Sequence, residues 1–150
     1  LAVVALECSA QSMRQDAEKL LATDGSAYEI ATAYLRRQRD VLKGCRMGRM
    51  TFDADVLNTP ELIEPVKRTF VWLLEALTVL FERGRDQGEF AADIDARNLA
   101  SLMVATVQGG YVLARATRDT DAFDAAVEGA AALLRKATVP LTTEVSDHSE

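Results

Sequence analysis

Residue types that commonly perform catalysis are sparse in this sequence of 150 residues. Its single histidine, His148, lies close to the C-terminus, so no histidine-based triad, histidine metal site or histidine general base is predicted in the core. The sequence contains neither a G-x-S-x-G nucleophile motif nor a glycine-rich phosphate-binding loop. We therefore expect no catalytic residues, no enzymatic activity and no cofactor.

Two pairs of closely spaced aspartates are the remaining candidates for metal or acid–base chemistry. Asp93 and Asp95 resemble the start of a calcium-binding loop, but Arg97 stands where a third oxygen ligand is needed, and no glycine follows it. Asp53 and Asp55 fit turn and helix-cap positions better than a catalytic pair. We expect no metal site.

The thiol of Cys45 leaves two interpretations open. Arg46 and Arg49 lie close to it in the sequence, and basic neighbours make a thiol more reactive, which favours a redox or electrophile sensor. The alternative is a small buried side chain in a turn. Cys8 has no such neighbours and is interpreted as structural. Two cysteines in the whole chain indicate a reduced, cytoplasmic protein rather than a disulfide scaffold.

The stretch 98–117 carries the strongest indication of a binding site. It is apolar over most of its length and has no formal charge before Arg115, yet Gln108 lies within it. A buried amide needs hydrogen-bonding partners, which a ligand, a dimer partner or water can supply. Tyr111 lies about one helical turn further on and can present its hydroxyl group to the same place.

Aromatic and methionine side chains at helical spacing can extend this site, although such residues also occur in plain cores. We predict a cavity for a small, mainly apolar effector. The residues expected to reach this cavity are Met13, Tyr34, Trp72, Met103, Gln108 and Tyr111.

The same stretch is apolar nearly all round when it is drawn as a helix, so it needs more cover than its own chain supplies. One of its sides consists mostly of small residues, which let helix axes approach closely. We predict a homodimer held by a four-helix bundle of 95–118 and 120–136 from each copy. The residues expected in this interface are Leu102, Ala105, Gly109, Val112, Ala116, Phe123, Val127, Ala130 and Leu134.

Helical periodicity and capping signals run through the sequence, and no strand pattern occurs. Ser26 and Glu29 form a capping box, and the sequence TPE at 59–61 is a helix start; Pro65 then either kinks this helix or moves its start to about Glu64. We predict an all-α fold, a helical bundle of five long helices and one short helix. The long helices are expected over 1–22, 26–43, 60–87, 95–118 and 120–136, and the short one over 52–57.

The length fits one domain, which we assign to 1–136, and we expect disorder over 137–150. The net charge of -6 disfavours binding of this chain alone to the phosphate backbone of a nucleic acid. No apolar run is long and uninterrupted enough to span a membrane. Leu1 is neither a methionine nor preceded by a cap residue, so we expect the chain to be a fragment or processed form that begins inside a helix.

Two segments carry a family resemblance: GCRMGR at 44–49 and, after a long helix, GRDQGEFAADIDARNLASLMVATVQGGYVLARATRD at 84–119. In order and spacing they resemble the C-terminal regulatory domain of TetR-family transcriptional repressors, over about residues 1–136. The resemblance implies an N-terminal helix-turn-helix domain that this chain lacks, with operator DNA contacted only through that domain. It also implies that 1–22 links the two domains and that the last two helices pair in a homodimer. The ligand cavity would then lie between the first long helix, the 60–87 helix and the central helix.

Two hypotheses from different classes follow. In the first, the chain is a ligand-sensing, dimerising module of a transcriptional repressor. A bound effector then shifts the first helix, and the two helix-turn-helix domains of the dimer no longer fit two half-sites of DNA. In the second, it is a purely structural all-helical dimerisation module without a ligand. Binding of any small molecule separates the first hypothesis from the second.

Overall fold

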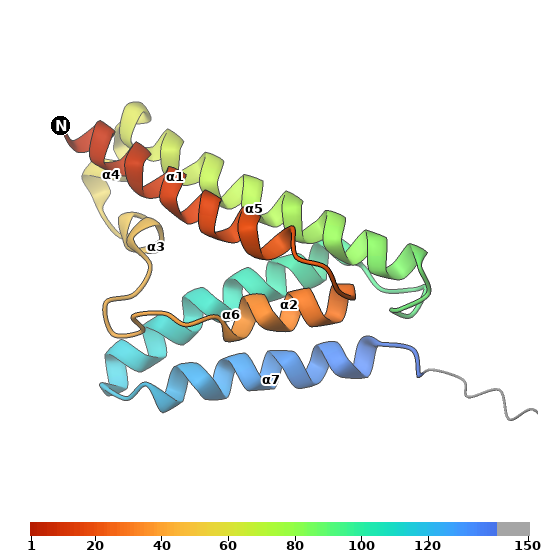
Figure 1. Cartoon of the computed structure of the whole chain (residues 1–150). Coiled ribbons are helices and arrows are strands. Elements are labelled where there is room, and N and C mark those ends of the chain that lie inside the picture. The colour runs from red at the N-terminus through yellow and green to blue at the C-terminus, as the bar shows by residue number, and fades with distance from the viewer. Residues whose placement is uncertain (141–150) are drawn as a thin grey trace, which may run out of the picture.

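Seven α-helices make up the computed structural model, which describes residues 1–140 (Figure 1). The predicted all-α class and the five long helices are confirmed, and two short helices occur where the sequence predicts one. Within the described part of the chain, β structure is limited to a single bridge between Phe90 and Thr138, and no helix there is both long and apolar enough to cross a membrane. In chain order the helices are α1 (Ala2–Leu21), α2 (Ala27–Arg36), α3 (Arg46–Met50), α4 (Ala54–Asn58), α5 (Pro60–Asp86), α6 (Ala96–Thr117) and α7 (Asp121–Ala137).

Three helix pairs account for most of the packing. α1 lies along α5, α5 packs against α6, and α6 packs against α7, while α2 contacts α1, α5 and α7 (Figure 1). The side chains at the centre are almost completely excluded from solvent, as expected for a close-packed apolar core. The largest of them include Ile30, Leu35, Leu73, Leu77, Phe81, Phe90, Met103 and Leu134.

Local signals set the starts of α2 and α5, as the sequence predicts. The Ser26 hydroxyl accepts a hydrogen bond from the Glu29 N–H (3.1 Å), and the Glu29 carboxylate accepts one from the Ser26 N–H (2.9 Å), which completes the capping box. α5 begins at Pro60 and continues as one helix through the buried Pro65. The earlier of the two alternative starts of this helix is therefore the one observed.

Helix α2 ends at Arg36, so the predicted end near Lys43 is wrong. The side chain of Arg39 explains the early end. Its guanidinium group donates hydrogen bonds to the carbonyl oxygens of Tyr34 (2.7 Å) and Leu35 (2.7 Å), which lie in the last turn of the helix and lack intrahelical partners. The chain beyond Arg36 is thereby turned away from the helix axis.

The segment between α2 and α5 contains two short helices rather than a turn and one helix. α3 begins after Cys45, whose sulfur accepts a hydrogen bond from the Gly48 N–H (3.4 Å). α4 begins after Asp53, whose carboxylate accepts a hydrogen bond from the Asp55 N–H (2.9 Å). Asp53 therefore occupies a predicted cap position, and Asp55 lies in the first turn of the helix. Phe52, predicted to begin the short helix, precedes α4 and is exposed.

The turn between α5 and α6 is docked onto the start of α2. The Glu89 carboxylate accepts hydrogen bonds from the N–H groups of Ala27 (2.9 Å) and Tyr28 (2.7 Å), which a helix start leaves without intrahelical partners. A Cβ added at Gly84 would lie 2.7 Å from the Ala27 Cβ and 2.8 Å from the Phe90 ring, so glycine is required for this close approach. We call the two hydrogen bonds from Ala27 and Tyr28 to the Glu89 carboxylate the Glu89 clamp.

Residues 137–140 differ from the predicted disorder that begins at Ala137. Ala137 is the last residue of α7, and its carbonyl oxygen accepts a hydrogen bond from the Ala91 N–H (3.0 Å). The Val139 N–H donates to the backbone carbonyl of Glu89 (2.8 Å). Backbone pairing with the α5–α6 turn therefore holds this segment. The rest of the predicted tail, 141–150, lies outside the described residues.

Candidate functional site

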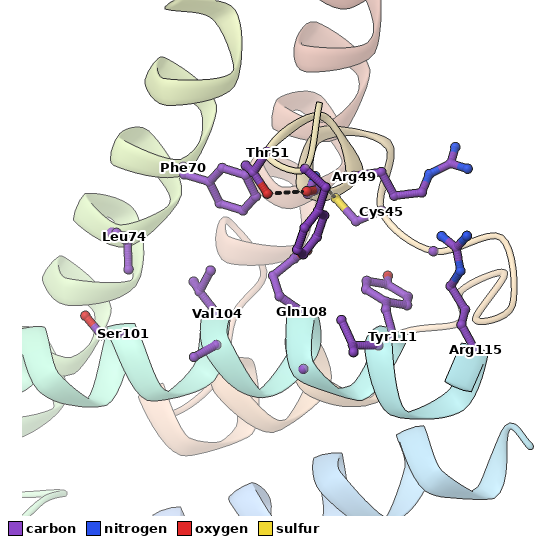
Figure 2. A pocket seen from close by; sticks show the side chains of 16 residues that line it. Cys45, Arg49, Thr51, Phe70, Leu74, Ser101, Val104, Gln108, Tyr111 and Arg115 are labelled. Carbon is purple, nitrogen blue, oxygen red and sulfur yellow. Dashed lines mark hydrogen bonds between the residues drawn. The ribbon is translucent and has the colours of Figure 1, made fainter. Parts of the chain in front are cut away.

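A cavity of about 810 Å³, here called the main cavity, lies between α3, α5 and α6 (Figure 2). Its volume falls in the range of sites for small organic ligands. Phe52 and Val112, two of its lining residues, are exposed to solvent. α5 contributes Phe70 and Leu74; α6 contributes Ser101, Val104, Ala105, Gln108, Gly109, Tyr111, Val112 and Arg115; the segment 44–52 contributes Gly44, Cys45, Gly48, Arg49, Thr51 and Phe52.

Helix α6 lines the main cavity with side chains at three- and four-residue spacing. Val104, Gln108, Tyr111 and Arg115 lie on one side of this helix, as their sequence spacing indicates. Val104 and Tyr111 are buried, Gln108 is half-buried and Arg115 is exposed. The helix therefore presents a surface that runs from an apolar end to a charged end.

Two glycines bring the segment between α2 and α3, and α3 itself, close to α6. Gly44 has a φ of 75°, a left-handed conformation that favours glycine. The Arg115 guanidinium lies 3.5 Å from the position that a Cβ on Gly44 would take. A Cβ on Gly48 would collide with the side-chain amide oxygen of Gln108. The absence of a side chain at Gly48 thus allows Gln108 to keep its place at the cavity, and Arg115 lies beside the turn at Gly44.

A second cavity, of about 680 Å³, is bounded by α1, the segment 43–47 and α6. Gly44, Cys45, Gln108 and Tyr111 line both cavities and form the wall between them. Cys45 is half-buried in this wall, and its sulfur is the acceptor at the start of α3. A molecule in either cavity would therefore contact the same amide and phenol groups.

Four of the six predicted ligand-binding residues surround one cavity, and two lie elsewhere. Met103 is fully buried in the core and lines neither cavity. Trp72 lies away from both, with the guanidinium of Arg14 4.8 Å from the centre of its ring. The four residues that line the second cavity are Met13, Tyr34, Gln108 and Tyr111, of which the last two also line the main cavity.

Several lining residues of the main cavity are missed by the sequence analysis. Phe70 and Leu74 belong to the apolar stripe of α5, which has the same pattern whether it faces a core or a cavity. Arg49 and Arg115 are not expected in a ligand site, because arginine is usually found at the protein surface. The available signal for Arg115 was its four-residue distance from Tyr111, which places both on one side of α6.

Burial and positive charge set the ionisation of the polar groups near the wall. Burial raises the pKa of Tyr34 and of Tyr111, and the nearby charges of Arg37 and Arg39 oppose this rise. Burial lowers the pKa of Arg39, whose guanidinium lies 5.4 Å from the centre of the Tyr34 ring. Both phenols are therefore neutral hydrogen-bonding groups near pH 7. Among residues 1–140, no cluster of three or more potential metal-binding side chains occurs.

The predicted dimer residues fall into two groups with different environments. Those on α6 are exposed, and Ala105, Gly109 and Val112 among them also line the main cavity. Those on α7 are buried against the same chain; the Phe123 ring, for example, lies 5.0 Å from the Tyr111 ring. The exposed α6 residues are Leu102, Ala105, Gly109, Val112 and Ala116, and the buried α7 residues are Phe123, Val127, Ala130 and Leu134. The exposed side of α7 carries Ala125, Gly129, Ala132 and Leu133 instead.

Three solved structures share this arrangement of helices. A TetR transcriptional regulator from Chloroflexus aurantiacus J-10-fl has a TM-score of 0.81 and 24% identity, over 91% of this chain and 72% of that chain. A TetR-family regulator from Cytophaga hutchinsonii has a TM-score of 0.80 and 20% identity, over 92% and 72%. One from Agrobacterium tumefaciens has a TM-score of 0.79 and 23% identity, over 92% and 73%. At these identities the likeness concerns the fold.

Comparison at the level of sequence gives the family. No curated protein matches the chain. A family model described as "Tetracyclin repressor-like, C-terminal domain" matches residues 25–130, which include α2 to α6, the two glycines Gly44 and Gly48, and most of α7. With this match over more than half of its length, the chain belongs to the family of tetracyclin repressor-like C-terminal domains.

Proposed function

We propose that residues 1–136 form the effector-sensing and dimerisation domain of a TetR-like transcriptional regulator, without enzymatic activity. The observation that carries this proposal is the position of α3. α3 contributes Gly48 to the lining of the main cavity, and it also buries Met47 in a cluster with Leu6 and Ala10 of α1. A ligand in the cavity therefore contacts a helix that also packs on α1.

The helix α1 is the element through which binding would reach DNA. In this proposal α1 continues from an N-terminal helix-turn-helix domain, and operator DNA is bound only through that domain, in the cytoplasm. An effector that binds better to one position of α3 also favours one position of α1, because the two pack together. The spacing between the two DNA-reading heads of a dimer then changes, and with it the fit to two half-sites.

The homodimer in this proposal forms through the exposed sides of α6 and α7. Leu102 and Leu113 lie on the same side of α6 as Gly109, and Leu133 lies on the same side of α7 as Gly129. The three leucines are 38%, 51% and 57% exposed. Small residues beside them let two helices approach closely, and a twofold axis repeats each favourable contact. This interface keeps the predicted α6 residues and uses the exposed side of α7.

Ligand binding that depends on the main cavity tests this function. A set of small, mainly apolar compounds should include at least one that raises the melting temperature of the chain in a dose-dependent manner. Leu74→Trp, which enlarges a side chain of α5 that lines the main cavity and lies outside the proposed dimer interface, should abolish the shift. Val71→Trp, a similar enlargement at an exposed position of α5 outside both cavities, should not.

A failure of this test has a defined meaning. If no compound stabilises the chain, or if the shift persists in Leu74→Trp, the alternative stands: a purely structural all-helical dimerisation module without a ligand. For a compound that passes the test, the full-length regulator should lose affinity for its operator when the compound is present.

A further inference from the structure

The main cavity has a charge distribution unlike that of the chain as a whole. The sequence contains 23 aspartates and glutamates against 17 lysines and arginines. Nevertheless, the described lining of the main cavity includes no carboxylate, whereas it includes the guanidinium groups of Arg49 and Arg115. A cavity without carboxylates offers no opposite charge to a cationic ligand.

The apolar and the charged side chains lie at opposite ends of the cavity. Figure 2 shows Phe70 and Leu74 of α5 at one end and Arg49 and Arg115 at the other. Along α6, Val104 and Arg115 are separated by roughly 16 Å of helix axis. The cavity therefore offers an elongated molecule an apolar surface along its body and two positive charges at one end.

The two arginines are available for an anionic group. Within residues 1–140, neither Arg49 nor Arg115 forms an ion pair with a carboxylate. Both are exposed, so a bound anionic group stays partly hydrated and avoids the cost of full desolvation. The Arg115 side chain lies beside the turn at Gly44. A guanidinium group binds oxyanions through two parallel hydrogen bonds, which a neutral ligand end cannot form equally well.

Positive charge also surrounds the wall between the two cavities. The second cavity is lined by Arg37, Lys43 and Arg46, with Asp16 as its single carboxylate among the described residues. The charges of Arg37 and Arg39 reach the phenol of Tyr111 and oppose the effect of burial on its pKa. The charged end of the main cavity thus lies in a region where positive groups outnumber negative ones.

We propose that the effector of this domain is an amphipathic organic anion, with a carboxylate or another oxyanion at one end of an elongated apolar body. The body lies against Phe70, Leu74 and Val104, and the oxyanion is held by Arg115 and Arg49 at the opposite end. This inference rests on the proposed function, because it names the class of ligand for the same cavity.

Three probes that share one apolar chain and differ in their end group test the charge preference: decanoate, decanol and decyltrimethylammonium. In calorimetric titrations of the whole chain at about pH 8, where a carboxyl group is ionised, decanoate should bind at least about tenfold more tightly than either of the other two. Decyl phosphate, as a fourth probe, distinguishes a carboxylate from a phosphate as the preferred oxyanion. Decanol binding as tightly as decanoate, or the cation binding best, would overturn the inference.

Removal of a positive charge at the end of the cavity that carries Arg49 and Arg115 locates the anion. Arg115→Gln and Arg49→Gln should each weaken decanoate binding by about tenfold and leave decanol binding unchanged. Arg97→Gln, which removes the same charge from an exposed position of α6 outside both cavities, is the matched control and should change neither. Equal loss of decanoate affinity in all three variants would contradict a specific contact. If decanol binds in the main cavity and decanoate binds no more tightly, the effector is not an anion, whereas the proposed sensing function is retained. No binding of any probe would overturn the inference, and the compound screen above then decides the function on its own.

Discussion

The side-chain amide of Gln108 on α6 packs against the backbone of Gly48 on α3, so closely that a Cβ on Gly48 would collide with the amide oxygen. The contact joins the helix at the centre of the fold to the short helix that packs on α1. Because Gln108 lines both cavities, its amide is also the group that a ligand in either cavity would meet. The relationship leads to a test that needs no ligand.

A double-mutant cycle on Gly48→Ala and Gln108→Ala should show energetic coupling between the two positions. Alone, Gly48→Ala forces the amide to move, which offsets the gain of about 1 kcal/mol that alanine brings to a helix. In the Gln108→Ala background the obstacle is gone and the gain should appear in full. Urea unfolding should give a coupling free energy of about 0.5–2 kcal/mol. Additive effects would show that the contact is not maintained in solution.

Gly110→Ala should destabilise the fold even though alanine is the better helix former. The added Cβ would lie 2.8 Å from the Phe123 ring, which is itself buried and cannot retreat. Overpacking of this kind costs about 1–3 kcal/mol. Gly129→Ala on α7 is the control in the monomer, because no atom of its own chain lies within 4 Å of the added Cβ, and there it should stabilise by about 0.5–1 kcal/mol. Chemical unfolding of both variants in the Leu133→Glu background, which is expected to be monomeric, compares the two.

Glu89→Ala should lower the free energy of unfolding by about 1–3 kcal/mol, because it leaves the N–H groups of Ala27 and Tyr28 without their carboxylate acceptor. Glu89→Gln should cost less, since its single carbonyl oxygen can still accept one of the two hydrogen bonds. Amide hydrogen exchange at Ala27 and Tyr28 provides the local readout. Unchanged protection of both amides in Glu89→Ala would contradict the role given to the clamp.

The chain should be a homodimer at tens of micromolar, with a mass in light scattering of twice the 16.4 kDa of one chain. Leu133→Glu should shift the population towards monomer, since it places a charge on the exposed side of α7 outside the cavity lining. Gly109→Trp should do the same from α6. Val79→Glu, at a residue of α5 that is 62% exposed, is the control for added charge. A dimer that survives both interface substitutions would assign the contact to another face.

Alkaline pH should destabilise the fold through Tyr34 and Tyr111. Burial raises the pKa of both phenols in the native state. As pH rises above about 10, tyrosines of the unfolded chain ionise first, so the unfolded state gains stability relative to the native state. The free energy of unfolding should therefore fall in that range and be insensitive to these groups below it. The double variant Tyr34→Phe/Tyr111→Phe should lose less stability between about pH 9 and pH 11; an equal loss would assign the effect to other groups.

The fold could be predicted well from the sequence where the signal is local. The capping box at Ser26 and Glu29 and the proline start at Pro60 depend on neighbouring residues, so the pattern contains the information. The end of α2 depends on Arg39 folding back onto carbonyl groups of a helix that has already ended. The apolar pattern does not indicate that α2 ends at Arg36, because Val41 continues the helical spacing beyond it.

The candidate site could be predicted only in part, for a related reason. Gln108 stands out because it is an amide among apolar residues, and the helical spacing brings Tyr111 with it. Met103 has the residue type of a ligand-binding side chain but faces the core, and no feature of the sequence separates these two environments. Phe70 lines the main cavity, although its position on the apolar stripe of α5 is typical of a core residue.

The Glu89 clamp holds the chain in place next to the C-terminal end of α1 and leaves the N-terminal end of this helix far from the contact. It anchors the first residues of α2, which directly follow the turn after α1, so the C-terminal end of α1 is a fulcrum. From there α1 extends over 20 residues, or about 30 Å, to its N-terminal end beside α3 and α4 (Figure 1). A tilt of about 5° about the fulcrum displaces that far end by about 2.6 Å. Met47 of α3 packs against Leu6 and Ala10, in the half of α1 that lies far from the fulcrum, where a given force exerts the larger turning moment.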